Sequence, residues 1–248
     1  MRRHARFLAL ALTLLAAGCA SVTVQAPKTA GPASQDPEAA WVRVLERHVN
    51  DAGRVDFAAI AKDPGDLEAY VASLETKDLF SDPKAHMADL INAYNALAMY
   101  NVVRSGIPPE LDSGKVRFFY STKFPVGGRT ISLYDLENKV IRPAADARVH
   151  TVLNCMARSC PRLPREPFRQ ATLEVQLDAA AREFFNEPRN VEVGPESVRF
   201  SEILKFYTED FLKSDPTLVA YANRWREAKI PEGRKIDFIP YDWTTNSP

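Results

Sequence analysis

The stretch MADLINAYNALAMYNVV, residues 87–103, decides the predicted fold. Pro83 precedes it, and Gly106 and Pro108 follow it, which are typical signals for the start and the end of a helix. Between these signals, apolar side chains occupy most of the circumference of the predicted helix. A helix that is apolar on nearly all sides has no face to give to water. We therefore predict that this helix lies buried at the centre of the fold.

Asn92, Asn95 and Asn101 interrupt the apolar surface of this helix. A buried amide costs about 1–3 kcal/mol unless it is hydrogen-bonded, so each of these side chains needs a partner. Two roles remain open. The amides anchor a neighbouring loop, or Asn92 and Asn95 line a pocket and bind a substrate.

Around the central helix, the sequence predicts further helices and short hairpins. The predicted helices span residues 132–141, 172–185, 203–211 and 216–225, and another begins at Asp36. The predicted strands span residues 116–120, 149–155 and 236–239, with hairpins over residues 124–131 and 191–200. Helices grouped with hairpins, rather than alternating with single strands, favour an α+β fold. In this fold, the central helix packs on a small antiparallel sheet and further helices surround it.

The first residues are typical of a targeting signal. Arginines at positions 2, 3 and 6 precede the apolar run Phe7–Ala17, which is too short to span a bilayer because spanning takes about 20 residues. The run ends in LAAGC, residues 15–19, which resembles the lipobox of bacterial lipoproteins. The resemblance implies cleavage before Cys19 and lipidation of that cysteine. An ordinary secretory signal is the alternative.

The chain therefore divides into three parts. We predict a signal peptide over residues 1–18, a lipidated Cys19 with a flexible tether to residue 35, and a single globular domain over residues 36–248. The tether is rich in Ala, Pro, Ser and Thr and has too few large apolar residues to fold. Ala20 stands where many lipoproteins of the inner membrane have aspartate. The predicted location is therefore the outer membrane, with the domain facing the periplasm.

The charge of the mature chain restricts its partners. Without residues 1–18, the chain keeps 29 basic and 32 acidic side chains, a net charge near −3. This balance gives no electrostatic reason to expect a nucleic acid. The expected partners are the membrane, reached through Cys19, and a small molecule or an envelope protein. We expect neither a cofactor nor a metal ion.

The stretch RVHTVLNCMARSCP, residues 148–161, is the first place to look for chemistry. A thiol nucleophile needs a base and a group that orients the base. His150 is the candidate base, and Glu137 or Asn92 is the candidate orienting group. If residues 149–155 form a strand, His150 and Cys155 point to opposite faces. Cys160 lies past a turn and is freer to approach His150.

Three interpretations of the two cysteines remain open. Cys155 and Cys160 are the only pair left once Cys19 is acylated, and an even pair in an oxidising compartment favours a disulfide. The four residues between them permit the Cα separation that a disulfide needs. The second interpretation is a reactive or redox-active thiol. The third, a metal site with His150, lacks an evident fourth ligand.

Several segments together resemble the family called domain of unknown function 547. They are Ile91–Leu97, Ser132–Leu133 with Glu137 to Arg142, Asp146–Pro161, Phe200–Ser201 with Phe206–Tyr207 and Asp210–Phe211, and Tyr241–Trp243 with Asn246. Members of this family often have a histidine where this chain has Asn138, so a mechanism with two histidines does not carry over. The family is broadly similar to papain-like and transglutaminase-like enzymes in packing a buried helix against a sheet.

Two functions follow from the sequence. The first is a lipid-anchored hydrolase or transferase acting on an amide or a thioester, with Cys160 as nucleophile and His150 as base. In this enzyme, Glu137 orients His150 and Arg142 meets an anionic group of the substrate. The other interpretation of Glu137 and Arg142 is that they pair with neighbouring residues. The alternative is a non-catalytic periplasmic lipoprotein that binds a ligand or a partner and contains a structural Cys155–Cys160 disulfide.

Overall fold

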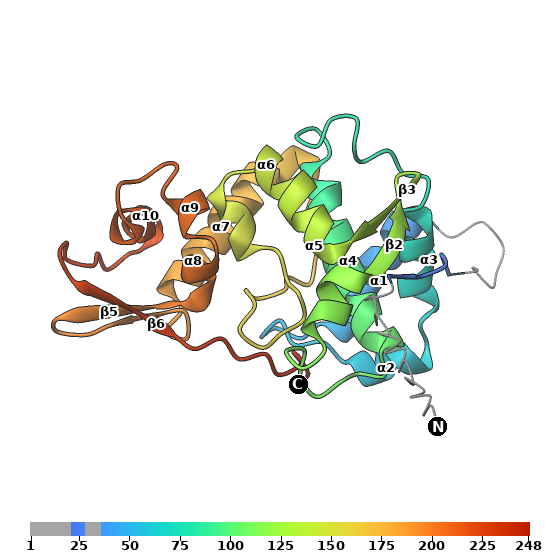
Figure 1. The fold of residues 1–248 in the computed structure, drawn as a ribbon, viewed down its shortest axis with the longest axis horizontal. Coiled ribbons are helices and arrows are strands. Elements are labelled where there is room, and N and C mark those ends of the chain that lie inside the picture. Colours follow the sequence, from blue (N-terminus) through green and yellow to red (C-terminus); the bar gives the residue numbers. More distant parts are fainter. Residues whose placement is uncertain (1–20, 28–35) are drawn as a thin grey trace, which may run out of the picture.

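The computed structural model describes residues 21–27 and 36–248. Within these ranges it contains ten α-helices and two three-stranded sheets, which confirms the predicted α+β class. The two sheets lie on opposite sides of the molecule, with most of the helices between them (Figure 1). The predicted signal peptide, the predicted lipidated cysteine and residues 28–35 of the predicted tether lie outside the described residues.

The helix predicted to be central is α4 (Met87–Arg104), and 14 of its 18 residues are buried. It packs against α2 (Phe57–Lys62) and α3 (Gly65–Ser73), and α3 in turn packs against α1 (Pro37–His48). The start of α1 at Asp36 is confirmed, because the Asp36 carboxylate accepts a hydrogen bond from the Glu38 amide. The main hydrophobic core forms around α4.

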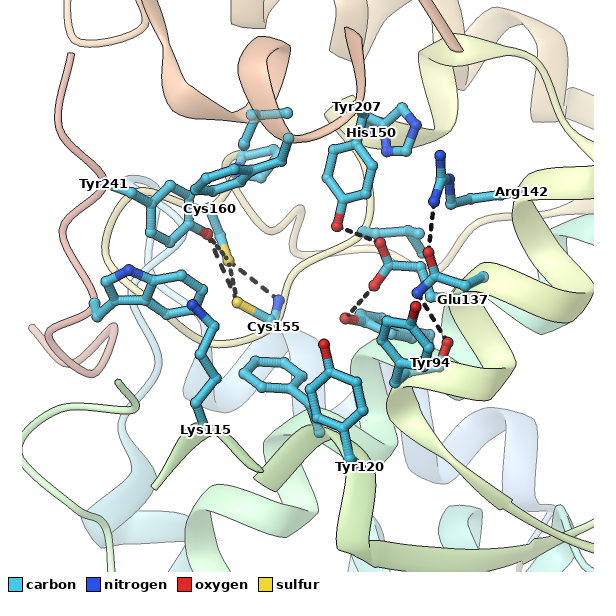
Figure 2. A pocket seen from close by; sticks show the side chains of 18 residues that line it. Tyr94, Lys115, Tyr120, Glu137, Arg142, His150, Cys155, Cys160, Tyr207 and Tyr241 are labelled. Atoms are coloured by element: carbon cyan, nitrogen blue, oxygen red, sulfur yellow. Dashed lines mark hydrogen bonds between the residues drawn. The ribbon is translucent and has the colours of Figure 1, made fainter. Parts of the chain in front are cut away.

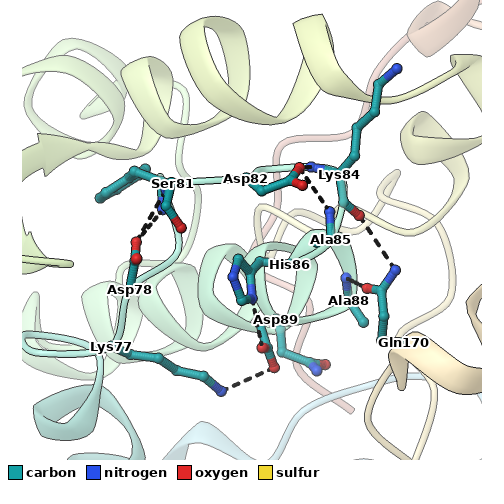
Figure 3. Close-up of polar contacts among 12 residues, drawn as sticks. Lys77, Asp78, Ser81, Asp82, Lys84, Ala85, His86, Ala88, Asp89 and Gln170 are labelled. Carbon is teal, nitrogen blue, oxygen red and sulfur yellow. Dashed lines mark hydrogen bonds and ion pairs between the residues drawn. The ribbon is translucent and has the colours of Figure 1, made fainter.

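Polar contacts fix the start of α4 (Figure 3). The Asp82 carboxylate accepts hydrogen bonds from the amides of Lys84 and Ala85, which closes a turn just before the helix. The Ala88 amide, one of the first in the helix, donates to the side chain of Gln170, 3.2 Å away. Amides in the first turn have no partner within the helix, so the Gln170 side chain takes the place of a missing carbonyl group for Ala88.

The first sheet has the order β1 (Val22–Thr23), β2 (Thr122–Val126) and β3 (Arg129–Ser132). The hairpin predicted around Gly127 is confirmed: β2 and β3 are antiparallel, and Gly127 and Gly128 have φ of +55° and +71°. β1 runs parallel to β2, so the predicted flexible tether is ordered at this point. The reason is that Val24 is buried and its amide donates to the Lys123 carbonyl.

The second sheet has the order β4 (Val191–Val193), β5 (Ser197–Ser201) and β6 (Lys235–Ile239). The predicted hairpin is confirmed, since β4 and β5 are antiparallel, but β5 and β6 are parallel. Both sheets are therefore mixed, whereas the sequence predicted one antiparallel sheet. This sheet and the helices α7 (Leu173–Asn186), α8 (Glu202–Phe206), α9 (Thr208–Phe211) and α10 (Leu218–Trp225) surround a second hydrophobic core.

Two predicted strands are absent, and helical turns occupy all of one and the start of the other. Residues 116–120 belong to the π-helical turn η1 (Val116–Ser121), and residues 149–151 belong to the 3₁₀ helix η3 (Ala147–Thr151). Short apolar runs do not distinguish a strand from a helix by period alone. At η3, the Asp146 carboxylate accepts from the Arg148 amide, 2.9 Å away, and caps the turn.

The connection between the two cores consists of short helical turns. The predicted helix after β3 begins as α5 (Leu133–Asp135), capped by Ser132, and continues as the π-helical turn η2 (Leu136–Ile141) and α6 (Arg142–Ala144). The 3₁₀ turn η4 (Gln170–Thr172) precedes α7. In the described part of the chain, no helix combines the length and the apolar character that crossing a membrane requires.

Candidate functional site

A pocket of about 370 Å³ lies where the two cores meet, and 18 residues line it (Figure 2). Its walls come from α4, η1, η2, α8, the segment after β6 and the loop of residues 152–161, called the cysteine loop below. Many of these side chains are aromatic, and the polar ones include a carboxylate, two thiols and two cations. The volume lies in the range of small-molecule sites, which are mostly apolar with a few placed polar groups.

Two buried asparagines hold the cysteine loop, residues 152–161, in place. The Asn95 side chain of α4 donates to the Val152 carbonyl and accepts from the Asn154 amide, 2.8 Å away. The Asn154 side chain donates to the Pro161 carbonyl and accepts from the Met156 amide, also 2.8 Å away. These bonds stabilise a loop in which Met156 has φ of +73°, which is uncommon for a residue with a side chain.

Two arginines also bind this loop. The Arg189 guanidinium donates to the carbonyls of Arg158 and Cys160, and the Arg54 guanidinium also donates to the Arg158 carbonyl. Charged donors form the stronger hydrogen bonds in proteins. The backbone that carries Cys160 is therefore held by the asparagines and by the arginines.

The segment after β6 closes the pocket. Its backbone bonds to two separate loops: the Trp243 carbonyl accepts from the Leu111 amide, and the Thr244 carbonyl accepts from the Arg158 amide. The Asp242 amide donates to the Ser159 hydroxyl, 2.8 Å away. This arrangement places the Tyr241 side chain against the two thiols (Figure 2).

Cys155 and Cys160 are both free thiols, with their Sγ atoms 3.1 Å apart. The disulfide that the sequence allowed is therefore absent from this structure, since bonded sulfurs lie about 2.05 Å apart. The Cys160 Sγ lies 3.1 Å from the Cys155 amide and 3.1 Å from the Tyr241 hydroxyl. Cys160 is buried, whereas Cys155 is partly exposed.

The two thiols differ in acidity. Burial opposes ionisation of Cys160, but hydrogen bonds from the Cys155 thiol, the Tyr241 hydroxyl and backbone amides outweigh it and lower the pKa of Cys160. The pKa of Cys155 is raised well above its ordinary value, because its thiol donates to Cys160 and because it is desolvated. Cys160 is therefore the sulfur that ionises first, and the thiolate is the nucleophilic form.

The variant Tyr241→Phe removes one donor to the Cys160 sulfur and leaves the ring in place. The ionised form loses a hydrogen bond, so the pKa of Cys160 should rise. The checking measurement is the rate of alkylation of Cys160 by iodoacetamide as a function of pH, and its midpoint should move upward in the variant. Tyr134→Phe, at the pocket wall away from the sulfurs, is the control and should leave the midpoint unchanged. An unchanged midpoint in Tyr241→Phe contradicts the role of this hydroxyl.

Glu137 of η2 faces the thiols from across the pocket (Figure 2). The sequence left two roles open for Glu137, orienting His150 or pairing with neighbours, and His150 is not among its hydrogen-bond partners in the described residues. Its two carboxylate oxygens instead accept hydrogen bonds from the hydroxyls of Tyr94, at 2.8 Å, and Tyr207. Burial is the main reason why the pKa of both phenols is raised well above the ordinary value, so they remain neutral donors.

His150 is paired with Asp210 rather than with a cysteine. Its Nε2 lies 2.8 Å from Asp210 Oδ2, and its ring stacks on Tyr207 with 3.9 Å between the centroids. Figure 2 shows the ring on the side of Tyr207 that faces away from the two sulfur atoms. Only 1% of the His150 side chain is exposed. The predicted His150–Cys160 pair is therefore not formed, because the Nε2 of His150 is bonded to Asp210 and its ring is stacked on Tyr207.

Arg142 shares Asp210 with His150. Its Nε donates to Asp210 Oδ2, 2.7 Å away, and its Nη1 donates to Asn138, the residue that replaces the histidine often found in the resembled family. The hydrogen bond from His150, together with those from Arg142 and Lys213, holds the pKa of Asp210 far below its usual range. Arg142 lines the pocket, but much of its charge is already neutralised, which weakens the prediction that it binds an anionic substrate group.

Asn92 and Asn95 were candidates for substrate binding, and neither lines the pocket. Asn92 donates to the Phe168 carbonyl and accepts from the Phe168 amide and the Trp41 indole, so it anchors the chain before α7. Their buried amides therefore have the anchoring role. No group of three or more His, Cys, Asp or Glu side chains suited to a metal ion occurs in the described ranges 21–27 and 36–248.

Sequence reasoning assigned no role to four residues that shape the site: Tyr94, Tyr207, Asp210 and Tyr241. All four lie in segments that carry the family resemblance, and this was the available signal. Glu137, His150 and Cys160, their partners among the predicted site residues, are 43 or more positions away in the sequence, so local patterns cannot reveal these pairs.

The fold and the site define an α+β protein with a small-molecule pocket that contains an acidic thiol opposite a carboxylate. Residues 79–185 match the sequence model of a family described as "Protein of unknown function, DUF547", which supports the resemblance noted in the sequence. The matched range includes Glu137, His150 and both thiols but ends before Tyr207 and Tyr241. Searches of curated proteins and of solved structures found no match to the chain.

Proposed function

We propose that this protein is a thiol-dependent acyl hydrolase or transferase in which Cys160 is the nucleophile. One observation carries the proposal: the Cys160 sulfur borders the pocket and has hydrogen-bond partners that favour its thiolate. A thiolate that is stabilised in this way needs no neighbouring base to become nucleophilic. The buried pairing of His150 with Asp210 is therefore compatible with catalysis.

The geometry favours thioesters over amides as substrates. The Cys160 thiolate attacks the carbonyl carbon, and the bond to the leaving group then breaks with its electron pair. An amine leaving group must be protonated, whereas a thiolate leaves without a proton. His150 faces Asp210 and is not placed to protonate an amine. The substrate class that fits is a thioester, and Cys160 carries the acyl group until water or another acceptor removes it.

The deciding experiment looks for this acyl-enzyme. Protein mixed with the acetyl thioester of N-acetylcysteamine should gain one acetyl mass on the Cys160 peptide in rapidly quenched mass spectrometry. Acetyl on Cys155 alone, or on neither cysteine for acyl chains of every length tried, rejects the proposal. Cys160→Ser is the negative control, and its peptide at this position should gain no acetyl mass.

The second candidate function is non-catalytic ligand binding. It is favoured by one observation, the near-complete burial of the His150 side chain in a pair with Asp210, which leaves the two sulfurs without the expected base. On this alternative, the pocket binds its ligand without turnover. The acyl-enzyme experiment separates the two functions, because a binding protein forms no covalent adduct.

We also infer that the protein is anchored by lipid at Cys19 in the outer membrane and faces the periplasm. The support is the basic start, the short apolar run and the LAAGC sequence at residues 15–19. Two acyl signals give stable anchoring, whereas one chain gives only reversible binding.

The variant Cys19→Ser tests the anchor. Cells that express the wild-type chain and are fed a clickable palmitate analogue should label the protein, and the protein should sediment with outer-membrane vesicles. The variant should lose the label and the sedimentation. Cys155→Ser is the control for labelling at another cysteine and should behave as wild type. Label that persists in Cys19→Ser contradicts the proposed anchor.

A further inference from the structure

Glu137 is a buried carboxylate without a cationic partner. It is 7% exposed, and its hydrogen bonds go to the neutral hydroxyls of Tyr94 and Tyr207. Within the described ranges, Glu137 forms no ion pair. A buried carboxylate is costly unless it is paired, and two carboxylate oxygens together can accept about four hydrogen bonds. The side of the carboxylate that faces the cavity is therefore open to a further donor.

Arg142 lies near Glu137 but is already bonded to other residues. Arg142 lies close enough for Glu137 to affect its pKa, but its hydrogen bonds go to Asp210 and Asn138. Lys115 stands at the thiol end of the pocket, with its Nζ 4.0 Å from the centre of the Trp243 ring (Figure 2). Its Nζ also lies 3.5 Å from Asp112 Oδ1, so part of its charge is neutralised. Arg142 and Lys115 thus both have carboxylate partners other than Glu137.

The walls next to Glu137 suit a cation. Tyr94 and Tyr207 flank the carboxylate. Tyr120 also lies near it, because the pKa of Tyr120 is raised by burial, by Tyr134 and then by the charge of Glu137. Tyr120 and Tyr134 stack with 4.3 Å between their centroids and are partly exposed, so they form the mouth on this side. Aromatic faces attract organic cations, and the attraction grows when water is excluded.

We propose that the Glu137 end of the pocket is a binding subsite for an organic ammonium group, such as the primary amine of a small ligand. The amine donates to the open side of the carboxylate, and the tyrosines surround its alkyl portion. The ligand therefore lies with its amine at Glu137 and its other end toward Cys160. The inference extends the proposed function by naming a ligand class for the same pocket.

The test measures binding in protein without pocket thiols, so that it does not depend on thiol chemistry. Hexylamine, 1-hexanol and hexanoate are titrated into Cys155→Ser/Cys160→Ser by calorimetry at neutral pH, with reduced wild-type protein alongside. A charge-assisted hydrogen bond corresponds to about a tenfold or greater gain in affinity. Hexylamine should therefore bind at least about tenfold more tightly than hexanol, and hexanoate should bind most weakly.

The variant Glu137→Gln, made in the thiol-free protein, locates the subsite. It should reduce hexylamine affinity by about tenfold and leave hexanol affinity unchanged, because only the charge is removed. Glu75→Gln, at an exposed position, is the matched control and should change neither. Equal affinity for amine and alcohol, or full amine affinity in Glu137→Gln, overturns the proposal. If Glu137→Gln does not fold, the comparison of hexylamine, hexanol and hexanoate still decides between the outcomes. The binding result does not depend on the proposed catalysis, because it is measured without the pocket thiols.

Discussion

Cys160→Ser is expected to lower thioester turnover by at least about a thousandfold, the scale of loss seen when an enzyme loses its nucleophile. The serine hydroxyl keeps the size of the side chain but does not ionise near neutral pH. The pocket and its ligand contacts remain, so the loss falls on kcat rather than on binding. The measurement is the consumption of the acetyl thioester of N-acetylcysteamine by the wild-type protein and the variant.

Cys155→Ser is the matched control for this prediction. A serine at this position still donates a hydrogen bond toward the Cys160 sulfur, which lies 3.1 Å from the present thiol. Turnover should therefore fall far less than in Cys160→Ser. If Cys155→Ser is the inactive variant and Cys160→Ser is active, the assignment of the two sulfurs is reversed.

Asp210→Ala is expected to lower the free energy of unfolding by about 3–5 kcal/mol, because it leaves buried groups without their partner. Asp210 is 8% exposed and pairs with His150, Arg142 and Lys213. The His150 ring and the Arg142 guanidinium both lie against Tyr207, whose hydroxyl bonds to Glu137. Removal of the Asp210 carboxylate should therefore also loosen the end of the pocket that contains Glu137. Urea denaturation measures the change.

Asp51→Ala is the control for this prediction, since 93% of the Asp51 side chain is exposed and its ion pair with Arg165 lies on the surface. Its effect should stay within about 0.5 kcal/mol. A loss below 1 kcal/mol in Asp210→Ala would falsify the structural role of this network.

The contribution of the Asp210 carboxylate to the free energy of unfolding should decrease as the pH falls. Its folded-state pKa is depressed, so the stabilisation is fully present above the unfolded-state value, about 4, and is lost as the pH falls toward the folded-state value. The difference in stability between the wild-type protein and Asp210→Asn should therefore be largest near neutral pH and should narrow below about pH 4.

The parts of the fold that local chemistry controls were predictable. The buried helix α4 follows from its apolar circumference, and the β2–β3 hairpin follows from Gly127 and Gly128, which adopt the positive φ that such turns require. The 3₁₀ helix η3 was missed because a single capped turn leaves no period to recognise. The parallel pairings of β1 with β2 and of β5 with β6 join distant segments and leave no local signal.

The site was predictable in its components and not in its pairings. The cysteine loop, Glu137 and His150 carry chemically active groups and were found from the sequence, and all of them border the pocket. Their partners were not found, since Tyr241 meets Cys160 across 81 positions and Asp210 meets His150 across 60. Cys160 remains the predicted nucleophile for a different reason: hydrogen bonds to its sulfur replace the expected base.

Brief alkylation of non-reduced protein at neutral pH, followed by peptide mass spectrometry, tests the central claim most directly. The structure predicts that iodoacetamide modifies Cys160 before Cys155, because Cys160 is the sulfur with the lowered pKa although it is the more buried one. Faster modification of Cys155, or a Cys155–Cys160 disulfide that leaves no thiol to modify, would contradict the account.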